Sequence, residues 1–229
     1  MRANKTRTVG ILLYEGFDPI DVTGPYDALS FAPDGMFAAF TVARSRGVVR
    51  AHHGLGMMAE EDFTTERPID ILLVPGSSTD VIARTRGEED LIAWTKARGA
   101  EAEIVLSICT GAGLVAKAGL LDGIAATTHW AYTHLLPRVG ATHEAARVVE
   151  DGNVVTSGGV TSGLDFALTL IGRLRGPATA QAIQLAIEYD PAPPYAGGHP
   201  DRTPEAVTEG LKARVYDAAA ARMEAALTS

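Results

Sequence analysis

The sequence has too few cysteines for a disulfide or a cysteine-based metal site. Its 229 residues include one cysteine, Cys109, so no disulfide can form within the chain, and we expect no zinc site built on cysteine. The six histidines form no H-E-x-x-H motif and no pair of ligands spaced four residues apart on a helix. We therefore expect no bound metal.

The sequence also lacks an excess of positive charge. Lysine and arginine total 20 against 28 aspartates and glutamates, a formal net charge of −8. Nucleic-acid binding draws its affinity mainly from cationic contacts to phosphates, so we expect no nucleic-acid partner. The basic start, residues 1–8, precedes an apolar run too short for a signal peptide, and no stretch is long enough to span a membrane. We expect a cytoplasmic protein with no membrane partner.

Short apolar segments alternate with longer helical patterns along the chain. Strands are predicted at Thr8–Tyr14, Phe37–Ala43, Ile69–Pro75 and Glu103–Ile108, and helices at Ile20–Phe31, Thr79–Gly99, Thr110–Ala118, Trp130–Leu136, Val160–Arg173, Ala178–Tyr189 and Pro204–Leu227. Asp151-Gly152, between two apolar segments, predicts a hairpin. Strands that are apolar throughout and separated by helices indicate a parallel sheet covered on both faces. No linker divides the chain, so we expect one domain over residues 1–229, with ligands bound beyond the carboxyl ends of the strands.

A candidate nucleophile lies where the fourth predicted strand turns into a helix. Ser107–Gly111 (SICTG) has the form small-x-nucleophile-x-Gly, with Cys109 as the nucleophile. A tight turn lifts such a side chain above the sheet edge, and the N–H groups of a helix N-terminus favour a thiolate. The same groups can stabilise an anion that develops on a substrate. The alternative is a buried core cysteine, but the strand-to-helix placement favours a nucleophile.

Two further features follow predicted strands. Asp21 comes after the first strand, where its carboxyl group either shares a proton with Cys109 or merely starts or caps the next helix. Gly76 and Ser77 follow the third strand, where backbone N–H groups either face a pocket as half of an oxyanion-hole-like site or form an ordinary turn.

Two other motifs favour structural interpretations. Gly111–Ala116 matches G-x-G-x-x-A, but it follows the fourth strand, and no acidic residue stands at the end of a clear strand about 20 residues later. Close packing of a helix on the sheet is therefore favoured over dinucleotide binding, and we expect no cofactor. His129 either lines the pocket or is a structural histidine. Thr110, not histidine, follows Cys109, so the sequence gives no local support for a Cys–His pair.

Five segments resemble the DJ-1/PfpI superfamily, and within it the isocyanide hydratases. They are Ile20–Pro25 (IDVTGP), Ser107–Gly111 (SICTG), Gly119–Trp130 (GLLDGIAATTHW), Gly152–Phe166 (GNVVTSGGVTSGLDF) and Gln184–Tyr195 (QLAIEYDPAPPY). The resemblance implies an α/β fold, a flavodoxin-like three-layer sandwich with a mostly parallel sheet and an elbow cysteine, assembled as a homodimer. Related sensor domains of transcription regulators carry a C-terminal helix-turn-helix, for which residues 204–229 leave no room.

The resemblance also implies roles for individual residues. Cys109 would be the nucleophile, Asp21 its acidic partner, Thr110 a hydroxyl or N–H donor beside it, and Gly76 the glycine whose backbone faces the pocket. Ser77 stands where the resemblance leads us to expect a second glycine. The implied reaction is hydration of a small-molecule isocyanide to an N-formamide. Two alternatives remain: a glyoxalase- or deglycase-like thiol enzyme acting on 2-oxoaldehydes, and a non-catalytic redox or ligand sensor.

Overall fold

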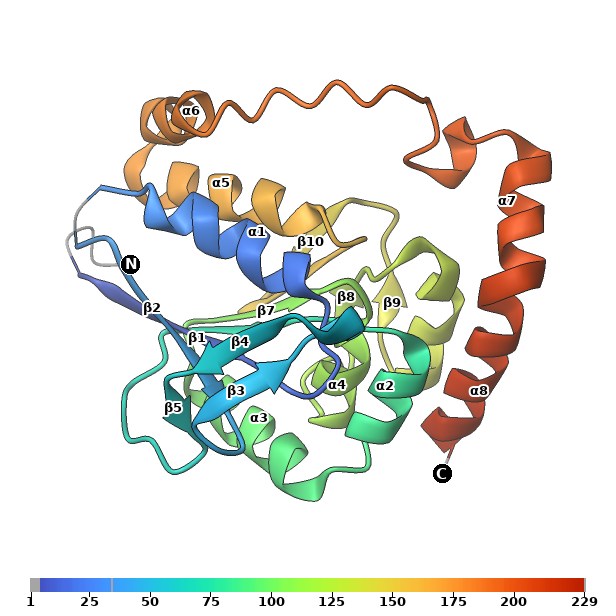
Figure 1. The fold of residues 1–229 in the computed structure, drawn as a ribbon, viewed down its shortest axis with the longest axis horizontal. Helices are drawn as coiled ribbons and strands as arrows, with labels where there is room; N and C mark the ends of the chain where they lie inside the picture. The colour runs from blue at the N-terminus through green and yellow to red at the C-terminus, as the bar shows by residue number, and fades with distance from the viewer. Residues whose placement is uncertain (1–4, 34, 229) are drawn as a thin grey trace.

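A computed structural model gives the fold of the protein and describes residues 5–33 and 35–228. The first four residues of the basic start therefore lie outside the described part of the chain. The elements are arranged around one large sheet, with a long C-terminal segment that runs across its top and down one side (Figure 1).

The central sheet has seven strands in the order β10-β11-β7-β6-β1-β2-β5. Their bounds are β1 (Arg7–Leu12), β2 (Phe37–Ala43), β5 (Glu61–Asp62), β6 (Ile71–Val74), β7 (Ile104–Ile108), β10 (Val148–Asp151) and β11 (Val154–Ser157). All neighbours run parallel except β10, which is antiparallel to β11. Strands β6 and β7 are buried at every residue, which is why both read as unbroken apolar runs. The prediction of a mostly parallel sheet is confirmed.

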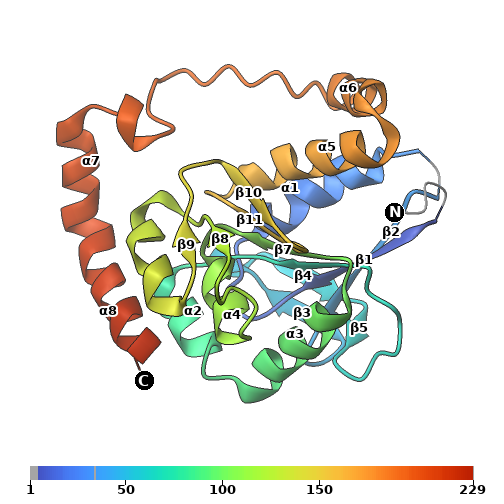
Figure 2. The ribbon, with the colours of Figure 1, turned by 180° about the vertical axis from the view of Figure 1, so that it is seen from behind.

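Helices cover both faces of this sheet. Helices α1 (Pro19–Ser30) and α5 (Ser162–Arg175) pack together on one face, and α2 (Thr79–Thr85), α3 (Glu89–Glu101) and α4 (Ala112–Lys117) lie on the other (Figures 1 and 2). The core between the layers is built from large, fully buried side chains such as Phe17, Phe40, Ile11 and Leu72. The three-layer, flavodoxin-like sandwich predicted from the sequence is confirmed.

Several local predictions need correction. The helical stretch Thr79–Gly99 is two helices, α2 and α3, and the predicted helix Trp130–Leu136 is a 3-10 helix, η3 (Trp130–Val139). The hairpin at Asp151-Gly152 is confirmed as β10–β11, with Gly152 at a φ of 61°. Further short elements are β3 (Gly47–Arg50), η1 (His52–Gly54), β4 (Gly56–Ala59), η2 (Cys109–Gly111), β8 (Ala125–Ala126), β9 (Thr142–His143) and η4 (Pro200–Arg202).

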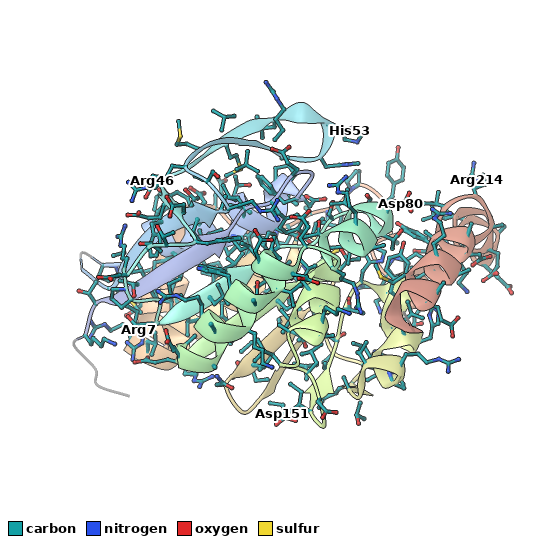
Figure 3. The ribbon with its side chains drawn as sticks, turned by 90° about the horizontal axis from the view of Figure 1, so that it is seen from below. Arg7, Arg46, His53, Asp80, Asp151 and Arg214 are labelled. Atoms are coloured by element: carbon teal, nitrogen blue, oxygen red, sulfur yellow. The ribbon has the colours of Figure 1, made fainter. Side chains whose placement is uncertain are left out.

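The chain ends in a segment that we call the C-terminal arm, residues 187–228. It leaves α6 (Pro177–Ala186) as an exposed extended stretch and then forms α7 (Glu205–Leu211), a π-helical turn η5 (Lys212–Tyr216) and α8 (Asp217–Thr228) (Figure 2). Helix α8 packs against α2 and η3. Two ion pairs fix it there, Arg222–Asp80 at 2.8 Å and Arg138–Glu224 at 2.7 Å. Figure 3 shows Asp80 on α2, on the side that faces this arm.

Candidate active site

Cys109 occupies a strained turn at the carboxyl end of β7. Its φ is 55°, a left-handed conformation that disfavours any residue with a β-carbon. The Cys109 N–H donates to Gly158 O at 2.9 Å, and its carbonyl accepts from Thr128 Oγ1 at 2.7 Å. Both bonds hold the turn in place from the neighbouring β11–α5 and β8–η3 connections. The residue is buried, with 5% of its surface exposed.

The glycines that follow the cysteine are packing residues. A β-carbon on Gly111 would lie 2.5 Å from Val74 O, and one on Gly113 would lie 2.9 Å from Ile82 Cγ2. The space on the β-carbon side of both glycines is therefore filled by β6 and α2, so a larger residue at either position would push the helix away from its neighbours. The packing interpretation of the G-x-G-x-x-A motif fits this structure.

Asp21 lies inside α1 and is completely buried, with 0% of its surface exposed. The helix cap is Asp18, whose carboxylate accepts the Ile20 N–H at 3.2 Å, so the interpretation of Asp21 as a cap is wrong. Asp21 Oδ2 instead accepts the Gly76 N–H at 2.7 Å. Its other oxygen, Oδ1, is buried and accepts no hydrogen bond from the described residues. A buried carboxyl oxygen without a hydrogen-bond partner lowers the stability of the folded state, so Oδ1 is a candidate for a functional role.

Gly76 joins the start of α1 to the cysteine turn. Its carbonyl accepts the Asp18 N–H at 2.8 Å, while its own N–H holds the Asp21 carboxylate. A β-carbon built on Gly76 would lie 2.7 Å from both Thr110 N and Thr110 Oγ1, and 3.0 Å from Asp21 Oδ2. The residue after the cysteine and the buried carboxylate therefore meet at this glycine, and only glycine fits between them.

The Thr110 hydroxyl makes two hydrogen bonds with the backbone of Ser77. The Thr110 hydroxyl donates to Ser77 O at 2.6 Å and accepts the Ser77 N–H at 2.8 Å. The Ser77 hydroxyl donates to Gly16 O. The N–H groups of Gly76 and Ser77 are thus already engaged, which disfavours the oxyanion-hole-like alternative. In this structure they hold Asp21 and Thr110 instead.

Burial dominates the electrostatics of Asp21 and Cys109. It raises the pKa of the Asp21 carboxyl well above its usual range, although the hydrogen bond from Gly76 opposes this. Burial, followed by the charge of Asp21, raises the pKa of the Cys109 thiol, while the hydrogen bond from the Thr110 N–H acts in the opposite direction. Burial here opposes the thiolate that the helix N-terminus would favour. The pair holds its protons more tightly than it would in water.

A cluster of aromatic side chains lies beside the turn. The Tyr216 ring, from the C-terminal arm, lies 5.1 Å from Trp130 and 5.2 Å from His129 between ring centroids. Burial lowers the pKa of His129 to about 4, so this imidazole is neutral at neutral pH. Its Nδ1 accepts the Ala131 N–H at 3.3 Å, which leaves the proton on Nε2. This hydrogen bond gives His129 a structural role at the start of η3.

An almost entirely apolar cavity opens next to the cysteine turn. Its lining residues are Thr110, Ala112, Gly113, Thr128, Tyr132, Leu135, Leu136, Val139 and Met223. Burial raises the pKa of Tyr132 to about 12, and the charge of Cys109 contributes to the shift, which places this ring within electrostatic range of the sulfur. Sequence reasoning missed Tyr132, Tyr216 and Met223, because no motif marks them and the last two lie far along the chain from Cys109.

Comparison with known proteins places the chain in a family. The DJ-1/PfpI family matches residues 7–173. This chain belongs to the DJ-1/PfpI family. It is 39% identical to the isonitrile hydratase of Pseudomonas putida, over 94% of this chain and 93% of that protein. It is 30% identical to the HTH-type transcriptional regulator CdhR of Pseudomonas aeruginosa, over 78% of this chain and 53% of the regulator.

The solved structures agree with this assignment. A ThiJ/PfpI family protein from Pseudomonas syringae superposes with a TM-score of 0.87 and 32% identity, over 95% of this chain and 90% of its own. Within residues 5–33 and 35–228, no cluster of three or more histidine, cysteine, aspartate or glutamate side chains could hold a metal ion. Over the same residues, no helix has both the length and the hydropathy to cross a membrane.

Proposed function

We propose that this protein hydrates isocyanides, R–N≡C, to N-substituted formamides. The observation that carries the proposal is the buried Asp21 carboxyl group, whose charge acts on Cys109, with one oxygen fixed by Gly76 and the other without a hydrogen bond from the described residues. A carboxyl group with a raised pKa can hold a proton at neutral pH and deliver it. The relation to an isonitrile hydratase supports the same reaction.

In the first half of the reaction, the sulfur and a proton add to one carbon. The Cys109 sulfur attacks the terminal carbon of the isocyanide and forms a C–S bond, while that carbon takes up the proton of the Asp21 carboxyl group. The S–H proton passes to the Asp21 carboxylate that results, so the product is a thioimidate, R–N=CH–S–Cys109, and Asp21 is again a protonated carboxyl group. No proton is lost or gained overall, because Asp21 gives one proton to the carbon and receives one from the sulfur.

In the second half, water replaces the sulfur. The Asp21 carboxyl group gives its proton to the thioimidate nitrogen, and the resulting carboxylate takes a proton from a water molecule whose oxygen attacks the carbon. The C–S bond then breaks, the carbon–oxygen bond becomes a carbonyl, and the remaining hydroxyl proton passes to the sulfur. The formamide R–NH–CHO leaves, and the thiol and the carboxyl group return to their starting states.

The occupied N–H groups favour this reaction over chemistry on a carbonyl. Attack on the carbonyl of a 2-oxoaldehyde creates an oxyanion, which enzymes stabilise with free N–H donors. Gly76, Ser77 and Cys109 donate their N–H groups to Asp21, Thr110 and Gly158, respectively. An isocyanide has no carbonyl oxygen, so proton delivery to carbon matters more for it than anion stabilisation.

The proposal is tested by turnover of cyclohexyl isocyanide, followed as the formamide. We expect Cys109→Ala to lose activity almost completely, and Asp21→Asn to lose about 10²–10⁴-fold in kcat/KM, the usual contribution of a positioned acid or base. Asp27→Asn is the matched control, because Asp27 lies on the same helix but is exposed. Equal rates for the wild type and Cys109→Ala would refute the proposal. A higher kcat/KM for methylglyoxal would favour the glyoxalase-like alternative.

Three expectations from the sequence stay predictions: one domain over residues 1–229, a homodimer and a cytoplasmic location. Exposed apolar side chains on α6 and the C-terminal arm are consistent with a second copy packing there, since Leu185 is 80% exposed and Tyr195 is 84% exposed. Light scattering after size-exclusion chromatography measures the oligomeric state. A monomer at micromolar concentration would contradict the homodimer.

A further inference from the structure

The C-terminal arm builds part of the site although it lies beyond the matched family region. The family match ends at residue 173, whereas the arm spans residues 187–228. Met223, on α8, is buried and lines the apolar cavity together with Thr110 and Tyr132. The fold common to the family therefore supplies the cysteine turn, and a segment beyond it supplies one wall of the cavity.

Tyr216 brings the same arm against Tyr132, which lines the cavity. It is the last residue of the π-helical turn η5, a rare helical form that often marks functional sites. Its ring packs edge-on against Tyr132, with the ring centroids 5.8 Å apart. Burial raises the pKa of Tyr216, and the charge of Cys109 adds to the shift, so the ring lies within electrostatic range of the nucleophile.

Buried side chains and two ion pairs hold helix α8 of the arm against the rest of the protein. Ala219, Ala220 and Met223 are buried along one side of α8. The ion pairs Arg222–Asp80 and Arg138–Glu224 join this helix to the two elements on either side of it, α2 and η3. Surface ion pairs contribute little free energy each, but together with the buried side they fix the position of Met223 relative to Thr110.

We propose that Tyr216 and Met223 determine which R group the enzyme accepts, and that this group is uncharged and apolar. The inference rests on the proposed hydration of isocyanides and names its substrate class. Thr110 connects the cavity to the neighbouring Cys109, while the rest of the lining offers almost no polar group to a substrate. A charged R group would lose its hydration there without compensation.

The first test measures kcat/KM for paired isocyanides. We expect Met223→Ala and Tyr216→Ala to raise the ratio of 2-naphthyl to isopropyl isocyanide by about tenfold or more, because the first removes bulk from the wall and the second removes the ring that packs behind Tyr132 in that wall. Met223→Leu conserves volume and should leave the ratio within about twofold. Val215→Ala is the control next to Tyr216, because Val215 is half exposed. The wild type should prefer methyl isocyanoacetate over isocyanoacetate by at least about 100-fold, because they differ in charge.

The second test does not depend on turnover. The chain has one cysteine, so intact mass reports alkylation of Cys109 alone. We expect the ratio of alkylation rates for N-cyclohexylmaleimide and N-methylmaleimide to rise about threefold or more in Met223→Ala and Tyr216→Ala, and to stay unchanged in Val215→Ala.

The two tests separate the two proposals. If no isocyanide is turned over but the alkylation ratio shifts, hydration is wrong and the arm still forms the wall of the site. If both ratios stay unchanged in Met223→Ala and Tyr216→Ala while each variant remains folded, the assignment of selectivity to the arm is overturned. Equal kcat/KM for isocyanoacetate and its methyl ester would overturn the apolar substrate class.

Discussion

Replacing Gly76 with alanine tests whether the site depends on close contact at this residue. The new β-carbon would lie 2.7 Å from Thr110 N and Oγ1 and 3.0 Å from Asp21 Oδ2. Two of these atoms belong to groups that cannot swing aside, a backbone nitrogen and a buried carboxylate. Overpacking of this kind costs about 1–3 kcal/mol. We therefore expect the free energy of unfolding to fall by that amount in urea denaturation.

The same substitution should affect activity more than stability. The strain is relieved if the Asp21 carboxylate and Thr110 move apart, and a displacement of about 1 Å at a reacting group can cost on the order of 10²-fold in rate. We expect kcat for isocyanide hydration to fall by about that factor while the variant remains folded. Gly24→Ala is the matched control, because a β-carbon there would lie 3.6 Å from Leu164 Cγ, an ordinary contact. Because Gly24 lies inside α1, Gly24→Ala should raise the free energy of unfolding by up to about 1 kcal/mol.

One result would refute this reasoning. If Gly76→Ala unfolds at the same urea concentration as the wild type and keeps its kcat, the carboxylate and the cysteine turn are not held together through Gly76. A loss of stability without a loss of activity would show that the strain is relieved away from Asp21.

Three further predictions concern the buried groups. Asp21→Asn should become progressively more stable relative to the wild type as the pH rises above about 4. The raised pKa of Asp21 means that the native wild type binds more protons than its unfolded state, so the wild type loses stability as the pH rises, whereas the asparagine variant does not. A difference in Tm that stays constant between pH 4 and pH 8 would contradict this. The wild type should gain at most about 3 kcal/mol in free energy of unfolding between pH 4 and pH 6.5, because the pKa of His129, about 4, lies below that of histidine in the unfolded chain. His129→Phe should remove this gain, as measured by urea denaturation at both pH values. An unchanged dependence of stability on pH would count against burial of His129 as the cause. Cys109→Gly should be about 1–2 kcal/mol more stable than Cys109→Ala, because the φ of 55° is strained for alanine but not for glycine. Equal urea midpoints for the two variants would argue against the strained turn.

Most of the fold could be predicted because the central strands are buried on both faces. Unbroken apolar runs such as Ile104–Ile108 leave little doubt about a parallel sheet. The hairpin β3–β4 could not be predicted, because its strands are four residues long and expose Val48 and Met58, each 59% exposed, so no clear alternation remains in the sequence. The break between α2 and α3 lies at Gly87, a single glycine followed by the acidic residues Glu88–Asp90, which form the N-cap and first turn of α3.

For the site, the sequence could predict which strand ends lie together, but not the contacts between the residues there. Asp21, Gly76 and Cys109 follow neighbouring strands β1, β6 and β7, so sheet order alone brings them to one edge. Sequence could not show that the N–H groups of Gly76 and Ser77 are already bonded, because those bonds depend on loop conformation. It also could not show the wall formed by Met223, because that contact depends on where the arm folds back.

The bonding of these N–H groups links the buried pair to one kind of chemistry. An oxyanion-hole donor contributes about 10²–10³-fold to reactions that pass through a tetrahedral oxyanion, so a site in which the N–H groups of Gly76, Ser77 and Cys109 are committed to Asp21, Thr110 and Gly158 forgoes the contribution of those three donors. What the site gains is a carboxyl group that is held still and keeps its proton because water is excluded. A substrate whose carbon must accept a proton as sulfur attacks benefits from that arrangement, whereas a carbonyl substrate does not. The same burial that makes Cys109 a poor free nucleophile therefore suits it to a reaction in which the nucleophile and the proton are added together.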